Sequence, residues 1–137
     1  MKELGRHIIA ELSDCNPRIL SNLEMVKELM VNGAKEANAE VREVAFHKFN
    51  PHGVSGVVVI AESHLSIHTW PEYNYAAIDI YTCGDTTDPW RACSYLALQF
   101  QAGNVAKTVV ERGIETPHGW FSHTVASSFS KGERQVG

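Results

Sequence analysis

Residues 41–83 divide into four short strand-like segments whose connections are too short to contain a helix. The segments cover residues 41–49, 54–60, 65–70 and 75–83, and the first connection, Asn50-Pro51-His52-Gly53, has the composition of a turn. Connections this short join antiparallel neighbours, because a crossover between parallel strands needs about a dozen residues or more. The middle of the chain therefore predicts an antiparallel sheet.

Side chains alternate along residues 41–49, 65–70 and 75–83, which is typical of half-buried strands, whereas the valine-rich residues 54–60 predict a buried strand. In residues 65–70 one face carries Leu65, Ile67 and Thr69, and the other carries Ser66, His68 and Trp70. In residues 75–83 one face carries Tyr75, Ala77, Asp79, Tyr81 and Cys83.

Two helices and two outer strands complete the predicted fold. Residues 21–38 have apolar side chains at helical spacing, and Asp88 followed by Pro89 is typical of the start of a second helix. Residues 6–12 and 104–111 predict further strands. The expected fold class is α+β, a two-layer sandwich with a mainly antiparallel sheet and two helices on one face. A length of 137 residues suits a single domain, and the polar residues from about 113 to 137 predict a loose tail.

The composition argues against nucleic-acid-binding and membrane-spanning classes of protein. The net charge is −4, with 12 basic and 16 acidic residues and no basic block, which argues against a nucleic-acid partner. No apolar stretch follows the first basic residues, and the longest apolar run, residues 54–61, is too short to cross a membrane. Three cysteines without a CxxC pair fit a reducing compartment, so we expect a cytoplasmic protein without a membrane partner.

Residues 62–72 gather two serines and two histidines within eleven positions. If the neighbouring strands pair, His68 and Cys83 would both approach the turn that bears Ser63, which would make a plausible reactive site. Spacing alone leaves other interpretations open. A serine hydrolase lacks its GxSxG turn here, and a zinc site at His64 and His68 lacks supporting ligand motifs, so no metal is expected. A purely structural hairpin also fits.

A resemblance to a known family favours one interpretation. Four stretches of the sequence are similar to the prokaryotic S-adenosylmethionine decarboxylase proenzymes, over about residues 1–112. They are Gly5-Arg6-His7, the run from Phe46 to Ile60 (FHKFNPHGVSGVVVI), the run from Glu62 to Glu72 (ESHLSIHTWPE), and Tyr81-Thr82-Cys83-Gly84-Asp85.

The resemblance implies that the chain cuts itself between Glu62 and Ser63, leaving a beta chain of residues 1–62 and an alpha chain of residues 63–137. Ser63 then becomes a covalent pyruvoyl cofactor. The hydroxyl attacks the preceding carbonyl, and elimination and loss of ammonia follow. A strained turn would help this attack. By the same resemblance His68 is the acid or base of the cutting step, a role that suits histidine near neutral pH, and Ser55 assists it.

Decarboxylation follows from the same resemblance. The pyruvoyl ketone forms a Schiff base with the substrate amine and accepts electrons when carbon dioxide leaves. Cys83 is the expected donor that returns a proton to the α-carbon. The implied product is decarboxylated S-adenosylmethionine, the aminopropyl donor for spermidine biosynthesis.

Substrate choice has alternatives, because relatives of the family act on arginine or ornithine. Phe49 and Trp70 can stack on an adenine, and Glu72 can bind ribose hydroxyls, which favours S-adenosylmethionine. Leu65 is assigned to the pocket wall. The resemblance also implies a homodimer with two sites at its interface. An unprocessed homologue that only binds a ligand or partner is the alternative from another class.

Overall fold

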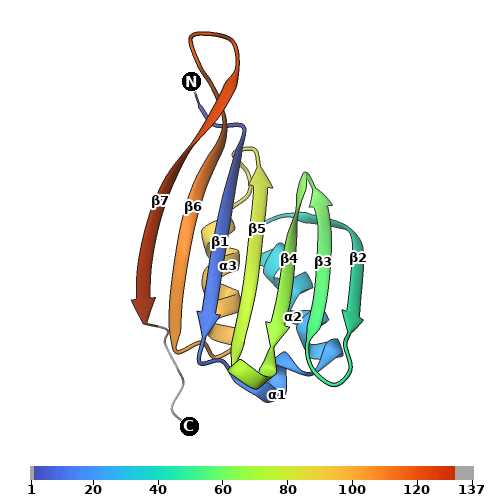
Figure 1. Cartoon of the computed structure of the whole chain (residues 1–137). Coiled ribbons are helices and arrows are strands. Elements are labelled where there is room, and N and C mark those ends of the chain that lie inside the picture. The colour runs from blue at the N-terminus through green and yellow to red at the C-terminus, as the bar shows by residue number, and fades with distance from the viewer. Residues whose placement is uncertain (1, 132–137) are drawn as a thin grey trace.

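In the computed structural model, which describes residues 2–131, seven strands form one antiparallel sheet in the order β2-β3-β4-β5-β1-β6-β7 (Figure 1). The elements in chain order are β1 (Gly5–Ser13), α1 (Pro17–Leu20), α2 (Leu23–Glu36), β2 (Glu40–Lys48), β3 (Val54–Ala61), β4 (Ser63–Trp70), the 3-10 turn η1 (Pro71–Tyr73), β5 (Tyr75–Cys83), α3 (Pro89–Gln99), β6 (Asn104–Glu115) and β7 (Phe121–Lys131).

The helices lie together on one face of the sheet (Figure 1), which confirms the predicted α+β two-layer sandwich. Helix α2 packs on β2, β3 and β4, and helix α3 packs on β1 and β5. Apolar side chains of the sheet and helices, such as Ile8, Leu65, Met30 and Phe100, are fully buried between the two layers. The opposite face of the sheet carries no helix, and we call it the open face.

Helix α2 and helix α3 begin where capping side chains satisfy their first backbone N–H groups. The Asn22 side chain accepts a hydrogen bond from the Met25 N–H at 3.1 Å, and the Asp88 side chain accepts one from the Arg91 N–H at 3.2 Å. The start of α3 is as predicted. Helix α2 begins later than residue 21, because residues 17–20 form the separate short helix α1.

The prediction of a loose tail is wrong for residues 113–131. Strand β6 continues to Glu115, and β7 pairs with it along its whole length, from Phe121 to Lys131. Every residue of β7 is exposed, because the strand lies at the edge of the sheet, beyond the helix layer (Figure 1). The strand therefore lacks the buried apolar face by which sequence patterns reveal strands. Residues 132–137 lie outside the described part of the chain.

Candidate active site

Ser63 occupies a strained position at the start of β4. Ile60 pairs with Ser63 across β3 and β4, so only Ala61 and Glu62 form the connection between these strands. The φ angle of Ser63 is 108°, a region that side chains other than glycine rarely adopt. The peptide bond that the resemblance identifies as the cleavage site therefore lies in a tight and strained turn, and Glu62 is exposed there.

Cys83 is the predicted site residue that reaches Ser63. Strand β5 pairs Thr82 with Ser63, which brings the next residue, Cys83, beside the turn. The Ser63 Oγ and the Cys83 Sγ lie 3.7 Å apart, within hydrogen-bonding distance for sulfur, and the pair is partly buried. A thiol that contacts Ser63 would also lie beside the pyruvoyl group that the resemblance implies at this position.

Ser55 and His68 form a second pair on the open face. The two residues lie opposite each other across β3 and β4. The Ser55 Oγ and the His68 Nδ1 are 2.7 Å apart, and which of the two atoms donates depends on the histidine tautomer. The hydrogen bond fixes the imidazole ring and makes a candidate proton-transfer pair.

A pocket of about 250 Å³ collects most of the other predicted site residues. Its lining includes Phe49, Trp70 and Glu72 together with Ser55 and His68. The side chains of Phe49 and Trp70 are 47% and 38% exposed, so both aromatic rings remain available to a ligand. The pocket thus combines aromatic surface, a carboxylate and a histidine in one place.

Tyr75 supports this pocket and was not among the predicted site residues. Its ring stacks on Trp70, with ring centroids 5.1 Å apart, and its hydroxyl donates to the Glu11 carboxylate at 2.5 Å. Burial, together with the hydrogen bond to Glu11, raises the pKa of Tyr75 to about 12. One face of Trp70 is therefore already covered, which leaves the other face for a ligand. Trp70 and Tyr75 lie opposite each other across β4 and β5, a pairing that depends on the register of the two strands and that the sequence alone does not give.

The predicted convergence of Ser63, His68 and Cys83 does not occur within one chain. Ser63 and His68 both belong to β4 and are five positions apart, which corresponds to about 16 Å along a strand. Cys83 contacts Ser63, whereas His68 lies opposite Ala77 and Ser55. The predicted site residues thus form two groups, one near each end of β4.

Leu65 belongs to the core and not to the pocket wall. Its side chain is fully buried on the helix side of the sheet, whereas His68 and Trp70 face the other way. The assignment is corrected because residues at odd and even positions of a strand face opposite sides, and Leu65 shares its side with Ile67.

A polar network missed by the sequence analysis crosses the open face between the two groups. The Asp79 carboxylate accepts a hydrogen bond from the Ser66 hydroxyl at 3.0 Å and lies 3.2 Å from the His7 Nε2. The hydrogen bond with His7 is the main cause that holds the pKa of Asp79 below its ordinary value. The Tyr81 ring stacks on His7, with centroids 5.2 Å apart, and the Arg112 guanidinium lies 4.8 Å from the Tyr81 ring centroid.

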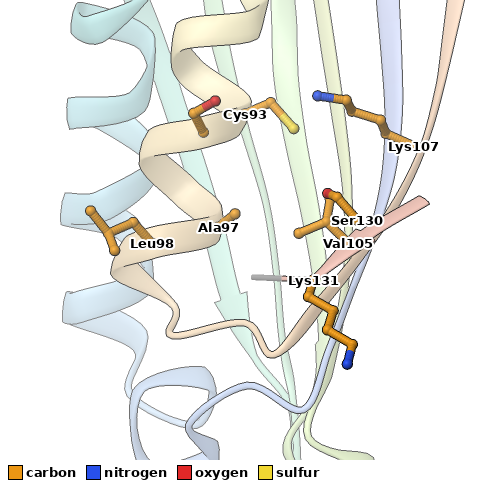
Figure 2. A pocket seen from close by; sticks show the side chains of 8 residues that line it. Cys93, Ala97, Leu98, Val105, Lys107, Ser130 and Lys131 are labelled. Atoms are coloured by element: carbon orange, nitrogen blue, oxygen red, sulfur yellow. The ribbon is translucent and has the colours of Figure 1, made fainter. Parts of the chain in front are cut away.

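Another pocket, of about 340 Å³, lies on the helix side between α3, β6 and β7, and Figure 2 shows it lined by Cys93, Lys107 and Lys131 among others. Burial raises the pKa of the Cys93 thiol, and the nearby Lys107 acts in the opposite direction. No predicted site residue lines this pocket, which separates it from the candidate site. Within residues 2–131 no group of three or more potential ligands could hold a metal ion, and no helix is long and apolar enough to cross a membrane.

Comparison with known proteins identifies the family. A model of the S-adenosylmethionine decarboxylase family matches residues 6–113. The chain belongs to the S-adenosylmethionine decarboxylase family. This confirms the resemblance seen in the sequence, and β7 lies beyond the matched region.

Relatives in this family cover most of the chain. The S-adenosylmethionine decarboxylase proenzyme of Thermoanaerobacter sp. (strain X514) is 58% identical over 114 residues, which are 83% of this chain and 92% of the relative. That of Moorella thermoacetica is 56% identical over 117 residues, 85% of this chain and 94% of the relative. The crystal structure of the adenosylmethionine decarboxylase from Aquifex aeolicus VF5 superposes with a TM-score of 0.80 at 40% identity, covering 85% of this chain and 97% of that one.

Proposed function

We propose that this chain is a proenzyme that cuts its own Glu62–Ser63 bond and then decarboxylates S-adenosylmethionine. The cut would leave residues 1–62 and residues 63–137, with a pyruvoyl group at the start of the second piece. The observation that carries the proposal is the contact between the Ser63 Oγ and the Cys83 Sγ, 3.7 Å apart, in a turn of strained backbone. Membership in a family whose relatives are named proenzymes supports it.

The residues around Ser63 fit a cofactor made from its own side chain. The hydroxyl and the carbonyl that it must attack belong to adjacent residues, and a φ of 108° holds the backbone away from the extended geometry of a strand. The pyruvoyl group supplies an electron-withdrawing ketone at this position. Cys83, already in contact with Ser63, is positioned to deliver a proton to the α-carbon of the substrate after carbon dioxide leaves.

The pocket residues fit the nucleoside part of S-adenosylmethionine. The free face of Trp70 and the exposed ring of Phe49 can stack on adenine and favour a sulfonium charge nearby. The exposed Glu72 carboxylate can accept hydrogen bonds from ribose hydroxyls. Arginine and ornithine offer neither a base nor a ribose, so they would leave these residues without partners.

The two groups of site residues support a homodimer with shared sites. A two-fold related copy packed on the open face would bring the Ser63 end of one chain toward the His68 end of the other. The open face also exposes apolar side chains that such packing would bury, among them Ile9, Val59, Val125 and Phe129, which are between 37% and 68% exposed. In that arrangement Ser55 and His68 of one chain would assist the cut in its partner.

Mixing two inactive variants tests the shared site. Ser63→Ala retains Ser55 and His68, and His68→Ala retains Ser63 and Cys83. If sites are shared, co-refolded mixtures should cut the His68→Ala chain, whereas each variant alone should remain intact or cut far more slowly. Mass spectrometry of the mixture reads the result. A His68→Ala chain that stays intact in confirmed mixed dimers would contradict the shared site.

Release of carbon dioxide tests the substrate. The purified wild-type protein should release labelled carbon dioxide from carboxyl-labelled S-adenosylmethionine and not from arginine or ornithine at equal concentrations. Release of carbon dioxide only from arginine or ornithine would contradict S-adenosylmethionine as the substrate. Release from none of the three by a cut protein would leave the decarboxylase assignment without support.

A further inference from the structure

Among residues 2–131, one buried side-chain nitrogen or oxygen has no hydrogen-bond partner, and it is the Thr82 hydroxyl oxygen. Thr82 is fully buried. An unpaired buried hydroxyl destabilises a fold, and such groups are rare enough to require an explanation. The other two buried threonines illustrate the normal case. The Thr69 hydroxyl donates to the Leu20 carbonyl at 2.8 Å, and the Thr87 hydroxyl donates to the Cys83 carbonyl at 3.2 Å.

The unpaired hydroxyl lies at the predicted cleavage site. Thr82 is the residue directly opposite Ser63 in the pairing of β4 with β5. Opposite residues in antiparallel strands hold their Cβ atoms about 5 Å apart, so the Thr82 side chain is within reach of the Ser63 backbone. Cys83 contacts the Ser63 hydroxyl from the open face, whereas Thr82 shares the helix side with Ile80. The thiol and the free hydroxyl therefore approach the turn from opposite faces of the sheet.

The self-cleavage reaction needs a donor at this turn. The Ser63 Oγ forms a bond to the Glu62 carbonyl carbon, and the bond from that carbon to the Ser63 nitrogen then breaks. The proton that leaves the hydroxyl ends on the nitrogen, so the product is an ester and no oxidant or reductant is required. Between the two events the Glu62 carbonyl oxygen carries negative charge. A prearranged hydrogen-bond donor at such an oxygen is often the largest single contribution to catalysis of acyl transfer.

We propose that Thr82 is a catalytic residue of the self-cleavage, whose hydroxyl donates a hydrogen bond to the Glu62 carbonyl oxygen as negative charge develops there. The proposal rests on the proposed function, because it names a residue for the same cut. A donor without a partner in the resting chain suits this role, since it breaks no existing hydrogen bond when the charge forms. This role also explains why position 82 carries an unpaired hydroxyl, although a valine would fill the same space without one.

The variants Thr82→Val and Thr82→Ser distinguish the effect of losing the hydroxyl from the effect of changing the packing of the side chain. Valine keeps the shape and removes the donor, so self-cleavage should slow by about 100-fold or more, as for the loss of an oxyanion donor. Serine keeps the donor and should stay close to the wild-type rate. Because valine also removes an unpaired buried group, the melting temperature of Thr82→Val should equal or exceed that of uncut Ser63→Ala. Cutting of Thr82→Val at the wild-type rate would overturn the proposal.

One control variant and one alternative test variant exclude a general effect on folding. Thr69→Val is the same substitution on the same side of the sheet, and it removes a hydroxyl that is paired with Leu20 and Val54. It should lower stability and still cut at the wild-type rate. If Thr82→Val does not fold, Thr82→Ala gives the second hydroxyl-free test, and wild-type cutting by it would equally overturn the proposal.

Treatment with hydroxylamine shows which step of the self-cleavage is slowed in Thr82→Val, ester formation or the later elimination. Hydroxylamine cleaves an ester at Glu62 whether or not the later elimination proceeds, so it should not restore cutting of Thr82→Val if the ester fails to form. Restoration would show that the ester forms without Thr82 and would overturn the assignment. A wild-type chain that remains intact would defeat the proposed function itself, whereas equal cutting by wild type and Thr82→Val would defeat only the role of Thr82.

Discussion

The two ends of β4 are built in different ways. At the end where we propose the cut, which we call the cleavage end, Ser63 contacts Cys83 and pairs with Thr82, and the important features are a tight turn, a positive φ angle and a buried unpaired hydroxyl. At the pocket end, where His68 and Trp70 lie, the strand is regular and exposed side chains form the site. The strained backbone at the cleavage end suits the cut, which happens once in each chain. The exposed aromatic rings at the pocket end suit substrate binding, which is repeated in every turnover. Substitutions in the turn should therefore change the cut, whereas substitutions of the exposed rings should change substrate binding. His68 is the exception at the pocket end, because we propose that it assists the cut in the partner chain.

The largest effect is expected from Ser63→Ala at the cleavage end. Without the hydroxyl no ester can form, so both self-cleavage and decarboxylation should be lost completely. Denaturing mass spectrometry and carbon dioxide release measure the two losses. The fold should persist, because Ser63 packs at the start of a strand and contributes little to the core. Decarboxylation by an uncut Ser63→Ala chain would contradict the role of the cleavage end.

Cys83→Ala should separate cutting from turnover. The chain should still be cut, at least in part, whereas kcat of the cut protein should fall by about 100-fold or more, the usual contribution of a positioned proton donor. Cys93→Ala is the matched control, since Cys93 is a buried thiol of the helix layer. It should lower stability and leave kcat unchanged. Wild-type turnover by cut Cys83→Ala would remove Cys83 as the proton donor.

Trp70→Ala tests the pocket end by itself. Loss of a stacking surface for adenine should raise KM about tenfold, since base stacking on an aromatic ring contributes about 1–3 kcal/mol. Self-cleavage should proceed normally. Trp90→Ala is a control of matched exposure, 37% against 38% for Trp70, and should leave KM unchanged. If Trp70→Ala blocked the cut as strongly as Ser63→Ala, the two ends would not be separable.

The smallest expected effect concerns Asp79, between the two ends. Its pKa is lower in the folded chain than its ordinary value, mainly because of the hydrogen bond with His7. The stabilisation is therefore complete above about pH 4, the ordinary range of aspartate, and is lost as the pH falls through the lower folded value. Denaturant unfolding should show wild type more stable than Asp79→Asn at pH 7, by a margin that shrinks below pH 4. A margin that does not change with pH would contradict this coupling.

Much of the fold could be predicted from local patterns. The alternation in residues 65–70 correctly placed Leu65, Ile67 and Thr69 on one common face, which the structure shows to be buried, and Asp88 with Pro89 located the start of α3. Strand β7 could not be found in this way, because all of its residues are exposed and its side chains need no alternation of polar and apolar positions. The short helix α1 was also missed, since its four residues are too few to show a helical period.

The sequence indicates candidate site residues but not how they are arranged in space. Ser55 and His68 are 13 positions apart, and their pairing depends on the register of β3 with β4, which spacing alone does not determine. Leu65 was misassigned although the alternation places it on the opposite face of the strand from His68 and Trp70, which line the pocket. Thr82 lies in the run Tyr81-Thr82-Cys83-Gly84-Asp85 that carries the resemblance, but the sequence analysis assigned it no role. What distinguishes Thr82 is an unmet hydrogen bond, which only the folded structure reveals.

The most direct test of self-cleavage is the intact mass of the purified wild-type protein under denaturing conditions. Cutting between Glu62 and Ser63 predicts two masses, one for residues 1–62 and one for residues 63–137 with the first residue converted to a pyruvoyl group. Reduction with borohydride should shift only the second mass, because only that piece carries a ketone. A single mass for all 137 residues, unchanged after prolonged incubation, would contradict the account.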